Sequence, residues 1–412
     1  MSELTYLEKL LDGVKVEWQT LGKVLKRTKG TKITAGQMKA LHKDNAPLKI
    51  FAGGKTVAFV DFKDIPEKDI NREPSIIVKS RGIIEFEYYD KPFSHKNEMW
   101  SYHSNNDAIS IKYIYYFLKI NEGYFQKIGG KMQMPQIATP DTDKFEVPIP
   151  CPDNPEKSLA IQSEIVRILD KFTALTAELT AELTAELNMR KKQYNYYRDQ
   201  LLSFEDGEVE WKALGTICQI GDGNHSSKYP KANEMIEQGI PFIRGTNMVN
   251  GTICNQDMKY ISKEKHNELK KGHLKAFDVL IANRGEVGKV AYVPEGYSGS
   301  NLNSQLAWLR ANPEIIINRY LFFILCSSTI QNKLSGEGGA LQQLTIKNIK
   351  NIQIPVPSIT VQSNIVSFLD KFDSLTNSIS EGLPREIELR QKQYEYYRDL
   401  LFSFPKPDTV SN

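Results

Sequence analysis

Lysine, histidine and cysteine side chains could bind phosphate or metals here, but their spacing fits neither role. The segment GGKT (53–56) has the end of a phosphate-binding loop, yet that motif needs glycine at position 49 and the chain has Lys49. The histidines show no HExxH pattern and the cysteines no CxxC pair, so we expect surface or core histidines and reduced, structural cysteines. These residues are His42, His95, His103, His225, His266, His273, Cys151, Cys218, Cys254 and Cys326.

Two further signatures of enzymes are missing from the sequence. The acidic segment PDNPEK (152–157) lacks the E-x-K spacing of nucleases, and its prolines suit a linker. There is no NPPY-like or DPPY-like signature of a methyltransferase. The sequence therefore predicts a chain with no catalytic activity by itself, no metal site and no cofactor of its own.

The composition bounds the class of protein. A length of 412 residues suits two globular domains with connecting elements. An apolar fraction of 40% and a charged fraction of 25%, with no long apolar run and no N-terminal leader, predict a soluble, cytoplasmic protein with no membrane partner. A net charge of +3 is compatible with a polyanion as partner but is too small to require one.

One segment of the chain occurs twice. Residues 158–204 recur at 358–404, 200 positions later without a gap, and 24 of the 47 aligned residues are identical, which indicates a duplicated element. The repeat separates two stretches that differ from each other, 1–157 and 205–357, and leaves a tail at 405–412. We expect one shared scaffold that carries two different recognition domains, with pseudo-two-fold symmetry.

The repeated segments have the pattern of long helices. Apolar residues recur every three or four positions from Ile165 onward, and TAEL is written three times between 176 and 187. The leucines of this run are Leu179, Leu183 and Leu187. In the second copy Gly382 and Pro384 interrupt the pattern and predict a kink or a break.

Each repeated segment closes with tyrosines among basic residues. The candidates are Tyr194, Tyr197 and Arg198 in the first copy, and Tyr394, Tyr397 and Arg398 in the second. The tyrosines can pack the two helices together, or they can form a docking surface for partner subunits. Both interpretations can hold, because a helix has more than one face.

The two variable segments read as mixed α+β domains. Apolar or alternating runs at 75–89, 277–283 and 289–294 predict strands. Both segments open alike, with EWQTLGKV and EWKALGTI, and both close alike, with VPIP and IPVP. We therefore expect one α+β fold in both domains, with different surfaces.

These features together resemble the specificity subunit of type I restriction-modification enzymes over essentially the whole chain. The paired YYRD helices and the [IV]-P-x-P exits carry the resemblance, with GDGNHSSKYP (221–230), GIPFIRGTN (239–247), FDVLIANRGEVGKVA (277–291) and SGEGGALQQLTIKNIKNIQIPVP (335–357). The first domain departs from this pattern at ITAGQMKALHKDN (33–45) and PFSHKNEMW (92–100).

The resemblance implies an architecture and a set of partners. Two globular target-recognition domains would each read one half of an interrupted double-stranded DNA target, separated by two long antiparallel, coiled-coil-like helices. The helices would bind two modification subunits, which in turn hold two restriction subunits. S-adenosylmethionine, ATP and Mg would be used by those partners, and the methylation state of the target adenines would separate self from foreign DNA.

The TAEL run has the geometry of a spacer. Each unit of four residues adds about 6 Å and roughly 40° of helix, whereas one base pair of B-DNA adds about 3.4 Å and roughly 35°. Removing one TAEL unit should therefore change the gap in the target by about one or two base pairs. Slippage in a repetitive gene explains how such a run could arise without excluding this role.

Base reading needs Arg, Lys, Asn or Gln at base edges, and the Gly-rich turns supply them. A solvated loop or a turn-capping amide is the alternative for each residue. The candidates in the second domain are Arg244, Asn247, Asn283, Arg284, Lys289, Asn303, Gln305, Gln342 and Gln343. Those in the first domain are Gln37, Lys39, His95, Lys96, Asn97, Lys131 and Gln133.

Two other kinds of protein remain open at this point. A helical scaffold whose variable domains bind proteins would show no salt-dependent, sequence-dependent affinity for DNA. A single-chain restriction-modification enzyme reduced to its recognition half would need nuclease and methyltransferase motifs, which the sequence lacks.

Overall fold

The computed structural model describes residues 6–130, 134–205, 207–225, 227–335, 343–377 and 382–405. The chain forms two compact units. Unit 1 comprises Met1–Leu179 and Arg390–Asn412, and unit 2 comprises Thr180–Leu389. Two helices, α7 (Pro155–Leu201) and α14 (Gly382–Leu401), contribute residues to both units.

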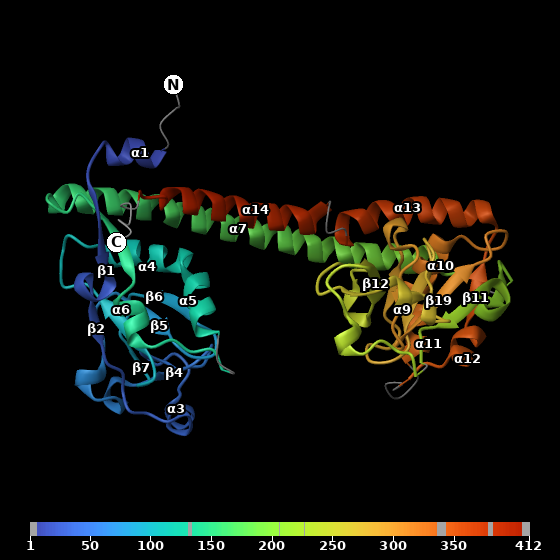
Figure 1. The fold of residues 1–412 in the computed structure, drawn as a ribbon, viewed down its shortest axis with the longest axis horizontal. Helices are drawn as coiled ribbons and strands as arrows, with labels where there is room; N and C mark the ends of the chain where they lie inside the picture. The colour runs from blue at the N-terminus through green and yellow to red at the C-terminus, as the bar shows by residue number, and fades with distance from the viewer. Residues whose placement is uncertain are drawn as a thin grey trace. The chain divides into compact units, whose positions relative to one another are not determined.

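Unit 1 is built on two sheets and a terminal strand pair (Figure 1). The four-stranded antiparallel sheet has the order β2 (Lys26–Thr28), β8 (Trp100–His103), β5 (Ser75–Lys79) and β6 (Glu85–Tyr89). The three-stranded sheet has the order β4 (Val57–Val60), β3 (Leu48–Phe51) and β7 (Phe93–His95), with β3 and β7 parallel. The opening and closing segments pair as β1 (Val16–Thr20) and β9 (Glu146–Pro150).

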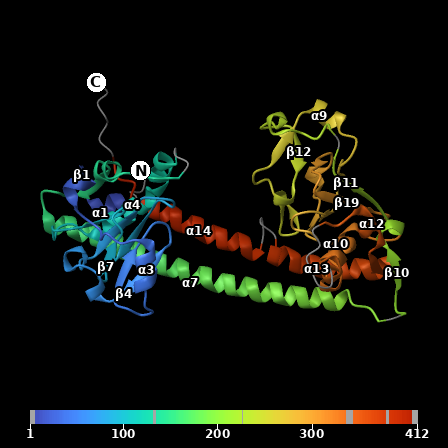
Figure 2. The same ribbon diagram turned by 90° about the horizontal axis from the view of Figure 1, so that it is seen from below.

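Helices cover these strands on the side of the long helix α7. Helices α4 (Ile111–Ile120) and α5 (Glu122–Gly129) pack on β5 and β6, and the same core holds Ile161, Ile165 and Leu169 of α7. The shorter helices are α1 (Tyr6–Leu11), α2 (Leu21–Val24), α3 (Ala35–Leu41) and α6 (Thr139–Asp143). Figure 2 shows α3 beside β4, where Thr34 and Gln37 form a capping box at its start.

Unit 2 repeats the strand order of both sheets and of the terminal pair. Its antiparallel sheet has the order β11 (Cys218–Asp222), β19 (Leu306–Ala311), β16 (Val279–Ala282) and β17 (Val290–Tyr292). Its second sheet has the order β15 (Lys259–Ile261), β12 (Ile240–Ile243) and β18 (Asn301–Leu302), again with one parallel pair. The opening and closing strands β10 (Glu210–Ala213) and β20 (Gln353–Val356) pair as in unit 1, and β13 (Met248–Val249) and β14 (Thr252–Ile253) form an additional hairpin.

The helices of unit 2 also follow unit 1. Helix α10 (Asn318–Cys326) lies between the sheet and α13 (Ile359–Asn377), as α4 lies between the sheet and α7. The others are α8 (Leu214–Ile217), α9 (Lys263–Glu268), α11 (Ser328–Ser335) and α12 (Ile346–Asn351). Tyr320 donates to the Pro355 carbonyl at 3.1 Å, as Tyr113 donates to Pro148 at 2.8 Å, so each helix fixes its exit strand in the same way.

The structure confirms the α+β fold class and the predicted strands. The run 75–89 is the hairpin β5–β6, and every residue of β5 is buried, which fits its apolar centre Ile76–Val78 and its place inside the sheet. The second repeat is divided into α13 and α14, as Gly382 predicted. This glycine has φ +75°, and a Cβ there would lie 2.6 Å from the Leu375 carbonyl oxygen.

Candidate nucleic-acid interface

Three loops meet at one edge of each unit, which we call the loop edge. In unit 1 these loops follow β3, β5 and β7, and the first and third share an edge because β3 and β7 run parallel. The loop after β5 joins them because β5 pairs with β8, which begins immediately after the third loop. The same three connections occur after β12, β16 and β18 of unit 2.

The central loop of unit 1, residues 80–84, is held by its backbone. Ser80 donates its hydroxyl to the Glu98 carbonyl at 2.7 Å and accepts from the Ile137 amide at 3.0 Å. Arg81 forms an isolated bridge with Gln136, and Gly82 adopts φ +78°, which favours glycine. The Arg81 side chain is exposed.

The central loop of unit 2, residues 283–289, is held by bonds to the corresponding neighbouring segments. The Asn283 amide donates to the Gln305 carbonyl at 3.0 Å, and the Leu344 amide donates to the Asn283 carbonyl at 2.9 Å. Arg284 forms an isolated bridge with Gln343 and is exposed. We name loops 80–84 and 283–289 the arginine turns, since each presents one exposed arginine before a glycine.

The neighbouring loops correspond as well. The Lys96 amide donates to the Phe51 carbonyl at 2.9 Å, and the Asn303 amide donates to the Ile243 carbonyl at 2.9 Å. A glycine lies against each of these loops. A Cβ on Gly223 would lie 1.9 Å from the Asn303 carbonyl oxygen, and one on Gly30 would lie 2.2 Å from that of His95, so neither position admits a side chain.

Buried charge anchors the unit 1 turn. Lys79, the last residue of β5, is buried and donates to Glu85 at 2.6 Å and to Glu87 at 2.8 Å. Burial alone would raise the pKa of Glu87, but the hydrogen bonds and charges of Lys79 and Lys49 outweigh it and lower the pKa below its ordinary value. An ion pair between the two strands therefore fixes the hairpin directly next to the turn that carries Arg81.

In unit 2 a different ion pair lies at the start of β16, the strand that leads into the turn. Asp278 precedes β16 and is only 1% exposed, and Arg310 donates to its two oxygens at 2.8 and 2.7 Å. The same carboxylate accepts the Lys275 amide at 2.8 Å. This bidentate pair stabilises the strand that leads into Arg284.

The structure places the sequence candidates in different surroundings. Several are exposed, namely Gln37, Lys39, Asn97, Arg284, Gln305 and Gln343, although Gln37 uses its side-chain oxygen in the capping box of α3. Lys96 is paired with Glu98 at 2.6 Å, and Lys289 with Glu286 at 2.5 Å. Lys131, Gln133 and Gln342 lie outside the described residues.

Other candidates are turned into the protein. The buried residues are His95, Asn247, Asn283 and Asn303. Asn247 holds its loop through the Cys254 and Gln256 carbonyls, and His95 contacts Ser101 and the Lys96 carbonyl. Arg244 is half-buried and donates to the Asp257 carbonyl at 2.5 Å. These side chains support the loops from within.

Sequence reasoning missed Arg81 and Gln136. The signal was present, because S-R-G at 80–82 follows a buried strand as N-R-G does at 283–285. Gln136 is exposed and forms a β-bridge with Arg81, as Gln343 does with Arg284. Strand pairing was needed to show that the two turns are equivalent.

The repeated tyrosines pack the helices within each unit. In unit 1 the ring of Phe172 lies 5.8 Å from that of Tyr397, and in unit 2 the ring of Phe372 lies 5.9 Å from that of Tyr197. Tyr194 is buried, Tyr394 contacts the Thr173 hydroxyl at 3.0 Å, and Arg198 and Arg398 each pair with the next aspartate. The most exposed tyrosines are Tyr196 at 61% and Tyr396 at 64%, the middle tyrosines of the same two clusters.

The TAEL residues belong to neither core. The cores of units 1 and 2 include α7 residues up to Leu169 and from Tyr194 onward. Leu179, Leu183 and Leu187 are half-buried. Helix α7 is continuous through this stretch, so whole turns can be added or removed there without opening either core.

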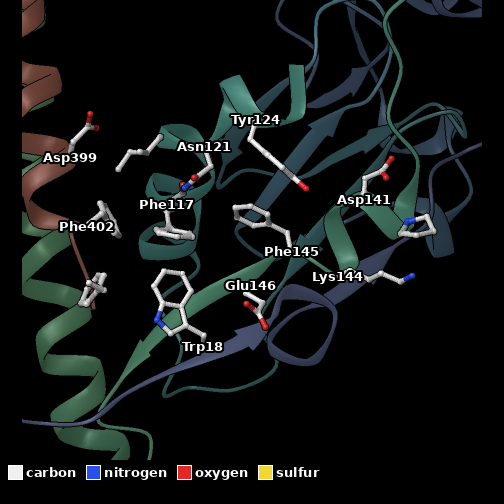
Figure 3. A pocket seen from close by; sticks show the side chains of 13 residues that line it. Trp18, Phe117, Asn121, Tyr124, Asp141, Lys144, Phe145, Glu146, Asp399 and Phe402 are labelled. Atoms are coloured by element: carbon white, nitrogen blue, oxygen red, sulfur yellow. The ribbon is translucent and has the colours of Figure 1, made fainter. Parts of the chain in front are cut away.

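Unit 1 also has a cavity of about 700 Å³ (Figure 3). Rings of Trp18, Phe117, Phe145 and Phe402 line it, with Lys144 at its rim. It contains none of the predicted DNA-contacting residues and lies where the closing elements of the unit meet. We interpret it as a packing seam.

The described residues also show no metal-ligand cluster and no membrane-spanning helix. No group of three or more metal-ligating side chains gathers in this part of the chain. Among the same residues, every helix is too short or too polar to span a lipid bilayer.

Two units with one topology, equivalent turns and different side chains define a two-part recognition protein. The model of the type I restriction modification DNA specificity domain matches residues 15–189 and 207–389, and the chain belongs to this family. The resemblance inferred from the sequence is thus confirmed.

Relatives span the whole chain. The EcoR124I/EcoR124II specificity subunit of Escherichia coli is 43% identical over 421 residues, which cover 100% of both chains. The EcoprrI specificity subunit of the same species is 37% identical over 92% of this chain and 93% of its own. A solved chain from the type I restriction-modification system has a similar fold, with a TM-score of 0.59 at 15% identity, covering 94% of this chain and 97% of that one.

Proposed function

We propose that this chain is the DNA specificity subunit of a type I restriction-modification complex and has no catalytic activity by itself. Residues 1–157 and 205–357 act as the two target-recognition domains, each reading one half of an interrupted target. The observation that carries this proposal is that one loop edge is built twice, with the same strand order and corresponding backbone bonds but different side chains. Equivalent scaffolds with different surfaces suit two different half-sites.

The repeats supply the partner surfaces in this proposal. Two modification subunits bind the helices and carry two restriction subunits, and they use S-adenosylmethionine, ATP and Mg in the cytoplasm. Exposed Tyr196 and Tyr396 occupy equivalent positions of the two repeats, as two copies of one partner require. Tyr197 and Tyr397 pack the helices together, and the exposed rings of Tyr196 and Tyr396 remain available to bind the modification subunits.

The TAEL run sets the gap between the half-sites. Deleting residues 180–183 removes one turn of α7, about 6 Å and roughly 40°, from a stretch that belongs to neither core. The test is methylation-protection mapping of the chain with its modification partner, wild type against deletion. We expect the same two half-sites with a gap shorter by about one or two base pairs.

Two results would count against this assignment. An unchanged gap would refute the spacer role of α7 while leaving the two half-sites intact. The absence of any bipartite target would refute DNA recognition itself and favour a protein-binding scaffold, for which DNA affinity would lack the steep dependence on salt. Replacing 180–183 by four alanines keeps the helix length and is the matched control.

A further inference from the structure

We propose that Arg81 and Arg284 are the equivalent base-reading residues of the two units, each contacting a guanine in its own half of the DNA target. The inference rests on the proposed function and extends it to a residue and a base. Arg81 was not among the candidates drawn from the sequence, and strand pairing shows that its turn is equivalent to that of Arg284.

The first argument is the pairing state of the arginines. Ten other arginines donate a side-chain hydrogen bond or form an ion pair within the described residues, and Arg390 bonds to Gln393 at 3.2 Å. Those ten are Arg27, Arg72, Arg167, Arg190, Arg198, Arg244, Arg310, Arg319, Arg385 and Arg398. Across the described ranges, Arg81 and Arg284 are the two for which no such side-chain bond is found.

The second argument is that these two arginines are equivalent in the fold. Each follows the buried strand at the same place in the four-stranded sheet, and each bridges to a glutamine, Gln136 or Gln343. The residue before each arginine accepts the amide of Ile137 or Leu344. Both units thus carry an arginine without a side-chain bond at the same position of the scaffold.

The third argument is the rigidity of the backbone beneath the side chain. Arg81 lies between Ser80, bonded on both sides, and Gly82, whose amide donates to the Pro135 carbonyl at 2.9 Å. The unit 2 turn is closed by the Gly288 amide on the Ala282 carbonyl, also at 2.9 Å. A fixed backbone lowers the entropic cost of placing the side chain, which base reading needs more than phosphate contact does.

The chemistry of the side chain selects the base. The guanidinium fork donates two hydrogen bonds to O6 and N7 of guanine, the commonest specific contact in the major groove. Lysine keeps the charge but presents no rigid fork. The exposed glutamine beside each arginine offers a second amide to the adjacent base, with adenine as its usual partner.

The experiment uses the complex of the full chain with its modification partner and duplexes that carry the mapped target or single base-pair changes in either half. For Arg81→Ala we expect discrimination to fall about 10- to 100-fold at one G·C pair of one half-site, with the other half-site read normally. Arg284→Ala should give the mirror result in the other half. Arg81→Lys should lose the same discrimination while retaining the dependence of binding on salt.

The controls separate the possible failures. Arg72→Ala, an exposed arginine of unit 1 paired with Glu67, should leave both half-sites unchanged. Uniform weakening on all duplexes by Arg81→Ala, with a salt slope smaller by about one, would identify a phosphate contact and overturn base reading. Relaxation at an A·T pair would overturn the guanine assignment, and an unaltered profile would overturn the whole inference. A wild-type complex with no bipartite target would instead refute the proposed function.

Discussion

Gln362→Leu should destabilise unit 2 more than any conservative change on its surface. Gln362 is completely buried at the start of α13. Its oxygen accepts the Ile317 amide at 2.8 Å, and its nitrogen donates to the Ile315 carbonyl at 3.0 Å and to the Pro357 carbonyl at 2.8 Å. The side chain thus ties the start of α10 to the exit of the variable domain.

The magnitude follows from the groups that would be left without partners. Leucine fills a similar volume but cannot hydrogen bond, so one amide and two carbonyls lose their partners. At about 1–3 kcal/mol for each buried unsatisfied group, with partial relaxation, we expect a loss of about 3–5 kcal/mol. That is a large share of the roughly 5–15 kcal/mol that stabilises a folded domain.

The repeat provides a matched comparison. Gln162 in unit 1 accepts the Ser110 amide at 2.9 Å and donates to the Ala108 carbonyl and the Ser158 hydroxyl, both at 3.0 Å. A hydroxyl can rotate to another partner whereas a carbonyl cannot, so Gln162→Leu should cost less than Gln362→Leu. Ser363→Ala, exposed and adjacent, is the neutral control.

The assay is equilibrium denaturation with hydrogen exchange at the Ile317 and Ser110 amides. Each substitution should lower the unfolding free energy and speed exchange at the amide that its glutamine protects. If the unfolding free energy of Gln362→Leu lies within about 1 kcal/mol of wild type, the net value of a single hydrogen bond, Gln362 does not hold α10 to the exit strand as argued. If one substitution speeds exchange at both amides, its effect is not confined to the unit that contains it.

Two further predictions concern the ion pairs on the strands that lead into the arginine turns. The pKa of Glu87 is lowered in the folded protein, so its pairing with Lys79 stabilises unit 1 above the unfolded pKa of about 4.3, and this stability is lost as the pH falls through the lower folded value. Between about pH 5 and pH 2, the unfolding free energy should therefore depend less on pH in Glu87→Gln than in wild type. An unchanged pH dependence would contradict this. Arg310→Ala leaves the buried carboxylate of Asp278 without its bidentate partner and should cost about 3–5 kcal/mol; adding Asp278→Asn should recover part of that loss in the same measurement, and a purely additive double variant would contradict the pairing.

Much of the fold follows from local sequence patterns. A few consecutive residues were enough to predict the strand β5 from its apolar run and the break in the second repeat from Gly382. The shared openings and exits indicated one fold in both domains, and strand pairing bears this out. Long-range pairing itself, such as β3 with β7, has no comparable signal.

The site was less accessible to sequence reasoning. Asn247 and His95 have the chemistry of base-reading residues, but burial decides their role, and burial depends on contacts from distant segments. The role of Arg81 became visible only from its bridge to Gln136, which shows that it occupies the position in unit 1 that Arg284 occupies in unit 2. The tyrosine clusters were found, but which ring faces outward depends on the partner helix.

The exchange of helix ends between the repeats sets an order for folding during synthesis. The unit 1 core includes Leu401, Phe402 and Phe404, and Trp18 donates to the Pro405 carbonyl across 387 positions. The unit 2 core instead takes Tyr194 and Leu202, which leave the ribosome before the rest of that unit. At about 5–20 residues per second, the first unit made waits tens of seconds for its last side chains, so the second unit can complete its core before the first.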